Sequence, residues 1–425
     1  MQPEGKTPKY DTSLGNTQGS LIGDHGTQTN IFQLFAEASA PLSSQIRIHE
    51  FETLVSERTR NFVGRDFVFK AINEVMRDGT FPSGYIVVRG EPGIGKTALV
   101  AELVKRTGCA HHFNIASQNI RSTNDFLANI CAQLVVKYDL PHPVLPPNAT
   151  ADSGFLSQLL VEVSSKNQPH PVLILLDALD EGDNATLPPE VNSLYLPQAV
   201  PPGIFFLVTA REEHDQRLVV DREKSIYLRE SDPQNRQDVL AYVSNFIKAE
   251  PEKMTPRIAE WGVSENEFAD ILSTKSEGNF MYLVYVLADI RDGLLKKTSI
   301  DNIQNLPKGL KSYYQRHWRT MKAQEPERFE KYYEPVICQL AVVREPVSIV
   351  QLEEWTRLPA LRVLEVVRSW RQFLNEDSEP DQQAVFRLYH TSFQDFLREE
   401  VGLKRFHERI VETALKKIPG FQTSP

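Results

Sequence analysis

The stretch Tyr85–Val100, YIVVRGEPGIGKTALV, decides the fold of this chain. An apolar run typical of a buried strand leads into a glycine-rich loop, and a helix-forming run follows directly. The loop has the spacing G-x-x-x-x-G-K-T, which is typical of a phosphate-binding loop between a strand and a helix. The residues expected to contact a nucleotide here are Gly90, Glu91, Pro92, Gly93, Ile94, Gly95, Lys96, Thr97 and Ala98.

The residue types in this loop suit a bound polyphosphate. Glycines let the backbone turn tightly, so that its N–H groups converge on an anion, and the N-terminus of the next helix adds positive charge. Lys96 supplies a cation for the β- and γ-phosphates, and the Thr97 hydroxyl can ligate Mg²⁺. An ordinary glycine-rich turn is the alternative, but the flanking strand and helix favour a phosphate loop. The sequence therefore predicts binding of a nucleoside triphosphate.

Composition limits the class of protein. The 425 residues are enough for two to four domains, and 41% hydrophobic and 24% charged residues are ordinary for a globular chain. A net charge of −9 argues against general nucleic-acid binding, although a local basic face stays possible. Three widely separated cysteines exclude a disulfide scaffold. With neither a signal peptide nor a bilayer-length apolar run, we expect a cytoplasmic protein without membrane contact.

Strand-forming and helix-forming segments alternate between residues 51 and 231. This alternation predicts an α/β fold, a P-loop NTPase domain with a doubly wound parallel sheet. The strands then stop, and we expect a small helical domain at 232–305. Three helices and a strand at Ala384–Tyr389 follow in the order of a winged helix, which we expect, with a C-terminal helix, at 306–425.

Residues 1–50 are expected to be a disordered tail, because much of this segment is rich in Gly, Ser, Thr, Gln and Pro. One patch, Gly19–Phe32, alternates small, polar and β-branched residues around glycines, a pattern that can stack as short strands. It resembles the N-terminal adhesion motifs that precede nucleotide switches in bacteria and fungi. This resemblance implies recruitment of an effector protein, and a plain flexible leader is the alternative.

A second group of chemically active residues follows the apolar run Val172–Leu176. That run has the length of a strand buried on both faces of a parallel sheet, and ligands bind at the carboxyl ends of such strands. Asp177 is placed to hold Mg²⁺ opposite Thr97. Asp180 and Glu181 are candidates for orienting or deprotonating the attacking water. A solvated acidic turn is the alternative.

Gly203–Arg211 predicts a further buried strand. Arg211 emerges at its polar tip, where it can touch the γ-phosphate and report hydrolysis, unless it is an ordinary surface arginine. A nucleotide-binding scaffold without hydrolysis is a third possibility for the whole chain. The intact set of Lys96, Thr97, Asp177 and Asp180 argues against such a scaffold.

These motifs together resemble a STAND-class P-loop NTPase, close to the NACHT and AAA+-like modules, over about residues 51–397. Phe62–Asp66 looks like the family's hydrophobic-Gly-Arg-Glu segment at the adenine, which implies base contacts from Val63, Gly64 and Arg65. Asp177–Glu181 matches the NACHT version of the acidic strand, and Arg211 takes the place of the family's sensor arginine.

The resemblance also implies site residues outside the sheet. Gly278-Asn279-Phe280 stands where the family has a Gly-x-Pro turn that packs on the base, here with Phe in place of Pro. Tyr389–Phe393 resembles the winged-helix segment whose histidine contacts the β-phosphate of ADP, which implies this role for His390. An imidazole N–H can donate to a phosphate oxygen and so tie domain closure to the nucleotide. Without the family, a histidine at a strand edge is more often structural.

The resemblance implies a signalling switch with slow, Mg²⁺-dependent ATP hydrolysis. ADP would lock the domains together, and ATP would open them and permit homo-oligomers. The best likeness is to NACHT proteins that carry C-terminal β-propeller repeats. No such repeat follows here, so the trigger is expected to be missing or to reside in another molecule. No guanine-specific Asn-Lys-x-Asp motif occurs, which favours ATP over GTP.

The alternative function is that of a DNA-associated AAA+ ATPase, similar to an origin-binding protein, that uses its winged helix. The expected helix Leu361–Leu374 has a small basic face, and a polar loop is expected after it, at Asn375–Gln383. Trp370 and Phe373 on the same helix instead suggest packing, and the acidic chain disfavours DNA. The basic residues of this helix are Arg362, Arg368 and Arg371.

Overall fold

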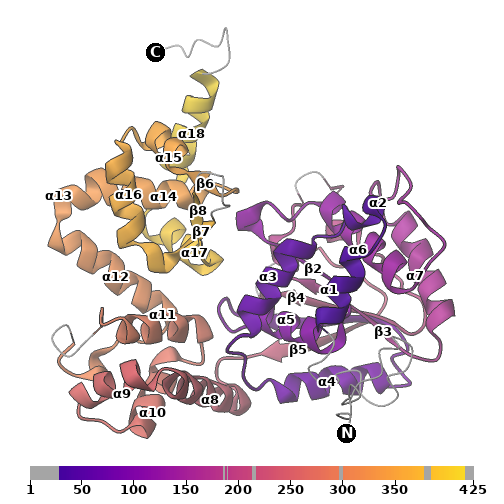
Figure 1. Cartoon of the computed structure of the whole chain (residues 1–425), viewed down its shortest axis with the longest axis horizontal. Helices are drawn as coiled ribbons and strands as arrows, with labels where there is room; N and C mark the ends of the chain where they lie inside the picture. Colours follow the sequence, from indigo (N-terminus) through magenta and orange to yellow (C-terminus); the bar gives the residue numbers. More distant parts are fainter. Residues whose placement is uncertain are drawn as a thin grey trace, which may run out of the picture.

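A five-stranded parallel sheet forms the centre of the N-terminal half of the chain in a computed structural model (Figure 1), confirming the predicted α/β class. The structure describes residues 28–184, 187–188, 190–212, 217–295, 300–377 and 384–416. The strand order of the sheet is β2-β3-β4-β1-β5, and all neighbouring strands are parallel. The strands are β1 Gly84–Gly90, β2 Ala110–Phe113, β3 Val172–Asp177, β4 Ile204–Ala210 and β5 Glu223–Leu228.

Strand order and burial follow from composition. β3 and β4 are buried along their whole length, as expected for apolar runs inside a parallel sheet. β5 lies at the edge and is mostly exposed, which suits its charged and polar residues. Because β4 lies between β1 and β3, the phosphate loop after β1 and the acidic end of β3 lie at the same edge, one strand apart.

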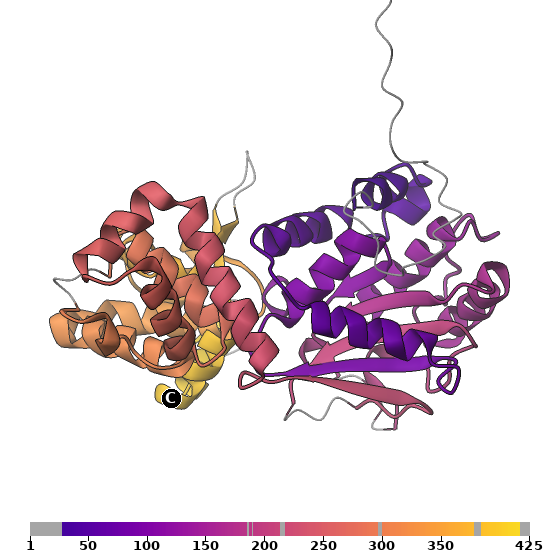
Figure 2. The ribbon, with the colours of Figure 1, turned by 90° about the horizontal axis from the view of Figure 1, so that it is seen from below.

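Helices pack around this sheet (Figures 1 and 2). The start of α6 is set by a local cap, because the Ser122 side chain accepts a hydrogen bond from the Asp125 N–H. The helices are α3 Ile48–Thr59, α4 Asp66–Arg77, α5 Lys96–Thr107, α6 Thr123–Lys137 and α7 Gly154–Asn167.

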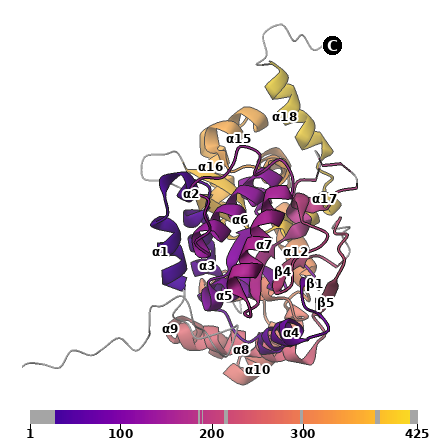
Figure 3. The same cartoon turned by 90° about the vertical axis from the view of Figure 1, so that its right-hand side faces the viewer.

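Residues 28–50 are not a disordered tail, so that part of the prediction is wrong. They form α1 Gln28–Ala36, α2 Ala40–Ser43 and the start of α3, and α1 lies beside α3 (Figure 3). Ile31, Phe32 and Phe35 are buried in the core of the sheet domain. These three apolar positions lie on one helical face, a short signal that the polar composition of the surrounding tail obscures. Residues 19–27 of the proposed adhesion patch lie outside the described residues.

Four helices follow the sheet: α8 Pro233–Ala249, α9 Pro251–Glu260, α10 Glu265–Ser276 and α11 Phe280–Arg291. They lie within residues 232–305, where the sequence predicts a small helical domain, and α9 is the one whose sequence argues against a helix. Pro251 is compatible with the first turn of α9, whereas Pro256 lies inside the helix, where proline normally argues against one. Asn279 caps α11 by accepting hydrogen bonds from two backbone N–H groups.

The C-terminal part adds helices and a small antiparallel sheet of order β6-β8-β7. β7 corrects two expectations: the helix predicted to reach Leu374 ends at Ser369, and residues 374–377 are a strand instead of helix and loop. The winged-helix assignment itself stays a prediction. The elements are α12 Leu310–Gln324, α13 Pro326–Arg328, α14 Glu334–Val342, β6 Val347–Ser348, α15 Ile349–Thr356, α16 Ala360–Ser369, β7 Leu374–Asp377, β8 Val385–Leu388, α17 Thr391–Glu400 and α18 Lys404–Lys416.

Two hydrophobic cores divide the chain. One ends at Leu228 and the other begins at Val239, which is consistent with a domain boundary near 231. The second core runs without a break from Val239 to Phe406, so the boundary expected at 305 is not marked by a gap in packing and stays a prediction. No helix among the described ranges combines the length and apolar character needed to span a membrane.

Candidate functional site

A cavity of about 300 Å³ lies at the carboxyl edge of the sheet, where three parts of the chain meet. The phosphate loop and the ends of β3 and β4 line one side. Tyr242, Phe280 and Val284, from α8 and α11, line another. His390 and Thr391, which precede and start α17, line a third. The cavity therefore has a largely apolar end and a strongly charged end.

The phosphate loop has the backbone that its glycines predict. Gly93 and Gly95 have φ values of 86° and 99°, which lie in the left-handed region that favours glycine. The Lys96 ammonium donates hydrogen bonds to the carbonyl oxygens of Gly90 at 2.7 Å and Glu91 at 3.1 Å. Burial lowers the pKa of Lys96, while Asp180 and Asp177 oppose that shift.

Asp177, the last residue of β3, is buried beside the loop. Its Oδ1 accepts a 2.5 Å hydrogen bond from the Thr209 hydroxyl. Burial raises its pKa, whereas hydrogen bonds from Thr209 and Thr97 and the charge of Lys96 act to lower it. Thr97 and Asp177, predicted as a pair of Mg²⁺ ligands, therefore lie next to each other.

Asp180 and Glu181 differ in the hydrogen bonds and ion pairs that their carboxylates make with other residues. Both carboxylate oxygens of Asp180 are engaged by Arg211, one by its backbone N–H at 3.2 Å and the other by its Nε at 3.0 Å. Glu181 accepts one hydrogen bond, from the Ala116 N–H to its Oε2 at 3.1 Å. Burial, with added repulsion from Asp180, raises the pKa of Glu181 to about 7. A carboxyl group with such a pKa is suited to exchanging a proton near neutral pH.

Arg211 joins the sheet domain to the C-terminal part. Besides Asp180, its guanidinium binds Asp395 at 2.7 Å and the Thr391 hydroxyl at 3.0 Å, both on α17. Asp395 also accepts a hydrogen bond from Arg398 at 2.8 Å. The residue predicted to contact the γ-phosphate is thus shared between an acid of the site and an acid of another part of the chain.

His390 lines the same cavity as Lys96 and Thr97. Its Nδ1 accepts a 3.1 Å hydrogen bond from the Ser392 N–H and so caps α17. Burial, together with the charges of Arg58, Lys96 and Arg211, lowers its pKa to about 3. The ring is therefore neutral, and because Nδ1 is an acceptor its proton is on Nε2.

Val63 and Arg65 line the cavity, but Arg65 is held by the protein itself. Its guanidinium donates to Asn235 Oδ1 at 2.7 Å and to the Ile94 carbonyl at 2.5 Å, and it stacks over the Phe280 ring at 4.9 Å. Burial lowers its pKa to about 10 despite the nearby Asp238 carboxylate. Arg65 therefore fixes the apolar end of the cavity to the helices that follow the sheet.

The turn before α11 contacts the phosphate loop directly. The Met281 N–H donates to the Gly93 carbonyl at 3.1 Å, and the Asn279 side chain donates to the Pro92 carbonyl at 2.9 Å. Phe280 lines the cavity and packs edge-on against Tyr242, with 5.5 Å between ring centroids. Four residues predicted from the sequence are not among those that line the cavity: Gly64, Gly90, Glu91 and Gly278.

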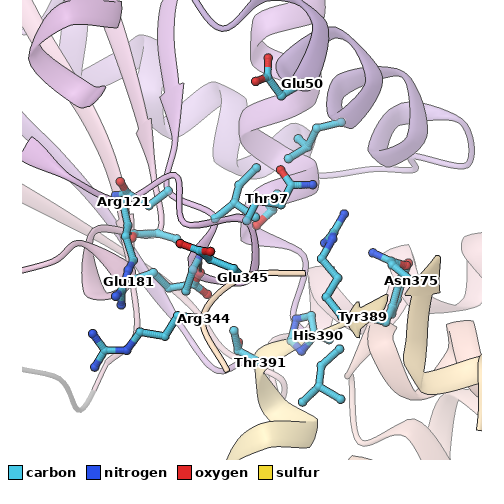
Figure 4. Close-up of a pocket in the computed structure, with 18 of the residues that line it drawn as sticks. Glu50, Thr97, Arg121, Glu181, Arg344, Glu345, Asn375, Tyr389, His390 and Thr391 are labelled. Carbon is cyan, nitrogen blue, oxygen red and sulfur yellow. Dashed lines mark hydrogen bonds between the residues drawn. The ribbon is translucent and has the colours of Figure 1, made fainter. Parts of the chain in front are cut away.

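A larger cavity of about 770 Å³ continues from the charged end (Figure 4). The two cavities share Thr97, Asp177, Glu181 and His390. In Figure 4 Thr97, from the sheet domain, faces His390 and Thr391, from the C-terminal part. The charged end is therefore open on a second side, between the two parts of the chain.

Sequence reasoning missed several residues of this site. Arg58 and Tyr242 lie on otherwise unremarkable amphipathic helices, and Asp395 is one of many surface-type acids. None belongs to a motif, so no local signal could have identified them. They reach the site only because α3, α8 and α17 converge on the edge of the sheet.

Comparison with known proteins supports the assignment of the sheet domain. Residues 61–195 match a family described as an AAA ATPase domain. The chain is 30% identical over 227 residues, 49% of its length, to a human NACHT domain- and WD repeat-containing protein 1, of which the match covers 14%. The mouse protein of the same name is 27% identical over 182 residues, 40% of this chain and 11% of that protein. The chain thus spans a small part of these relatives.

Among solved structures, a STAND ATPase with a tetratricopeptide repeat sensor from Pyrococcus horikoshii is similar. It is 15% identical, with a TM-score of 0.42, and the match covers 84% of this chain and 46% of that one.

Proposed function

Starting from a chain that is a P-loop NTPase related to the NACHT and STAND proteins, we propose that it acts as an ATP-dependent signalling switch. In the resting state, bound ADP would hold the sheet, the helices after it and the C-terminal part together. Exchange for ATP would open this arrangement and permit homo-oligomers, and slow hydrolysis would reset it.

One observation carries the proposal: the cavity that contains the phosphate loop is lined from three parts of the chain. Lys96 comes from the sheet domain, Phe280 from α11 and His390 from the turn before α17. A ligand that binds all three stabilises only the conformation that brings them together. Its phosphates can therefore bias domain closure, which is what a nucleotide switch requires.

The residues present fit a nucleotide. The cavity volume of about 300 Å³ lies at the lower end of the range for small-molecule sites. Its apolar wall of Phe62, Val63, Tyr242 and Phe280 suits a purine ring, and the phosphate loop at the other end suits the phosphates. Nothing in the sequence favours guanine, so we propose ATP and ADP.

The residues also fit Mg²⁺. Thr97 and Asp177 would hold it, and an Asp carboxylate whose ionisation is opposed by burial gains most from a divalent cation. Mg²⁺ would supply neutralisation of phosphate charge.

We assign general-base catalysis to Glu181. Both oxygens of Asp180 are already engaged by Arg211, whereas Glu181 has no hydrogen-bond partner for Oε1 among the described residues, lines the cavity with Thr97 and Asp177, and has a pKa of about 7. Glu181 would accept a proton from water, and Arg211 would stabilise negative charge that develops at the γ-phosphate. Asp180 then acts as a positioning residue for Arg211.

The central test is the nucleotide that copurifies with the chain. Wild-type protein is expected to contain ADP and Lys96→Ala none, since the loop loses its cation, while Lys70→Ala, an exposed lysine on α4, keeps ADP. His390→Ala is expected to form oligomers without added ATP. Nucleotide-free wild-type protein, or equal ADP in Lys96→Ala, would refute nucleotide binding at this loop. A monomeric His390→Ala with normal ADP affinity would refute the switch.

No observation favours the DNA-binding alternative. Trp370 and Phe373 are fully buried, as the packing interpretation of this segment expected. Arg362 pairs with Glu365 at 2.9 Å and stacks on Tyr332, which reduces the basic face. Effector recruitment by the N-terminal patch rests on residues mostly outside the described ranges and stays a prediction.

A further inference from the structure

Arg58, in the last turn of α3, reaches the charged end of the site from a direction that no motif predicts. It lines both the 300 Å³ and the 770 Å³ cavities, together with Thr97, Asp177 and His390. Its Nη1 donates a 2.9 Å hydrogen bond to the Tyr389 hydroxyl, and its Cζ lies 5.1 Å from the centroid of the Tyr389 ring. His390, which follows Tyr389 in the sequence, lies at the same end of the cavity.

Arg58 differs in its charge partners from the other two arginines that line the 300 Å³ cavity. Arg65 is paired with Asp238, and Arg211 is paired with Asp180 and Asp395. Within the described ranges, no carboxylate lies at ion-pair distance from Arg58. A half-buried guanidinium has five N–H donors, and one tyrosine hydroxyl and one ring face satisfy few of them.

Arg58 is also one of several cations near the His390 ring. Its positive charge, with those of Lys96 and Arg211, acts on the His390 imidazole, so three cations from three segments surround this ring. Asp177 and Asp180 act on Lys96, and Asp180 and Asp395 pair with Arg211. Of the three arginines that line the 300 Å³ cavity, Arg58 is the one with no carboxylate at ion-pair distance among the described residues, and the shape of a guanidinium matches phosphate oxygens.

We propose that Arg58 is a phosphate ligand of the nucleotide site, positioned for that role by Tyr389. The inference rests on the proposed function, because it requires nucleotide phosphates at the loop. Since Tyr389 belongs to the C-terminal part, movement of that part would withdraw the group that orients Arg58. The sheet domain would then bind phosphate most tightly in the closed arrangement.

The test compares affinity for ADP with affinity for adenosine, which lacks phosphates, on the full chain stripped of nucleotide. Arg58→Gln is expected to weaken ADP binding by about 10- to 100-fold, in the range of a lost charge-assisted hydrogen bond, and to leave adenosine binding unchanged. Arg58→Lys keeps the charge but loses the fork, so an intermediate loss is expected. Tyr389→Phe keeps the ring and loses the hydroxyl, and a smaller loss of ADP affinity is expected. Arg60→Gln, an exposed arginine two residues along, is the matched control and should match wild type.

The outcomes separate the inference from the proposed function. Wild-type ADP affinity in Arg58→Gln, with Lys96→Ala defective, would overturn the role of Arg58 and leave the proposed function standing. Equal loss of ADP and adenosine in Arg58→Gln would show a structural link to Tyr389 only and would also overturn it. Wild-type ADP affinity in Lys96→Ala would refute the proposed function itself. If Arg58→Gln does not fold, the ratio of ADP to adenosine affinity in Arg58→Lys decides in the same way.

Discussion

At the scale of single residues, neighbouring acids of one motif have different roles because their partners differ. Asp180 is paired with Arg211, and Glu181 accepts one backbone hydrogen bond from the part of the chain that the structure describes, in a poorly solvated position. The pKa of Glu181 is raised to about 7 from a model-peptide value near 4.5. Burial and local repulsion, not the motif, set this difference.

Glu181 is therefore expected to destabilise the nucleotide-free protein as the pH rises. Below pH 4.5 both folded and unfolded states hold the proton; between pH 4.5 and 7 only the unfolded state ionises, so stability from this group is lost as the pH passes through the folded pKa. Glu181→Gln removes this effect. The melting temperature of Glu181→Gln relative to wild type should rise between pH 4.5 and pH 7.5. A difference that is constant or falls over this range would contradict the raised pKa.

Gly64 gives a second prediction at this scale. Its φ is 64°, and a Cβ added there would lie 1.8 Å from Asp238 Oδ1, the carboxylate group that accepts from the Arg65 N–H. Gly64→Ala should lower the free energy of unfolding by about 2 kcal/mol or more, from left-handed strain and this clash. In a denaturant series, Gly64→Ala/Asp238→Ala should be less destabilised than the sum of the single variants. Strict additivity would show that the clash does not matter.

At the scale of elements, the N-terminal helices belong to the fold. α1 contributes Phe32 and Phe35 to an aromatic group around the buried His111 ring, with Phe51 and Phe113. Burial lowers the pKa of His111 to about 4, so this ring stays neutral and acts as part of the core. The folded core of the sheet domain therefore includes α1.

The packing of α1 into the core can be tested by truncating one of its buried side chains. Phe35 is fully buried, so Phe35→Ala should reduce the free energy of unfolding by about 3–5 kcal/mol through lost burial and the cavity left behind. Gln33→Ala, exposed on the same helix, should be within about 0.5 kcal/mol of wild type. Chemical denaturation monitored by circular dichroism measures both. Equal stability of the two variants would mean that α1 does not pack as described.

At the scale of the whole molecule, the contacts that hold the parts together are concentrated at the candidate site. Arg211 binds Asp395 and Thr391, Arg58 binds Tyr389, and Met281 binds the phosphate loop through its backbone. Figure 2 shows the sheet domain and the remaining helices as two lobes that meet there. Because most of these residues also line the cavity, a ligand in it competes with or reinforces these contacts.

Asp395→Asn is expected to loosen the closed arrangement. It removes one of the two carboxylate partners of Arg211 while keeping the size of the side chain, and a partly buried charge pair that loses one member is costly. The ADP-bound variant should have a larger radius of gyration by X-ray scattering than wild type, and faster nucleotide release. Glu399→Gln, which removes an exposed ion pair with Lys311 on the same helix, is the control and should behave as wild type. Identical scattering for Asp395→Asn and wild type would exclude Arg211–Asp395 as a closing contact.

The parallel sheet, its phosphate loop and the acidic strand beside it could be predicted from the amino-acid sequence. These depend on local features: glycines that permit left-handed turns, an apolar run long enough for a buried strand, and acids placed directly after it. Lys96, Thr97 and Asp177 could be found because one strand–loop–helix unit and one strand end hold all three. The family resemblance added His390, which lies at the same cavity.

Only the tertiary structure decided which residues face that loop. Arg58, Tyr242 and Asp395 are separated from Lys96 by tens to hundreds of residues, and their own surroundings in the sequence are ordinary. The structure likewise decided that Arg211 engages both oxygens of Asp180 while Glu181 is bound by the Ala116 N–H, and that α1 is part of the core. The physical reason is the same throughout: burial, charge pairing and closure of a cavity depend on distances between elements, and those distances are set by packing and not by any local pattern.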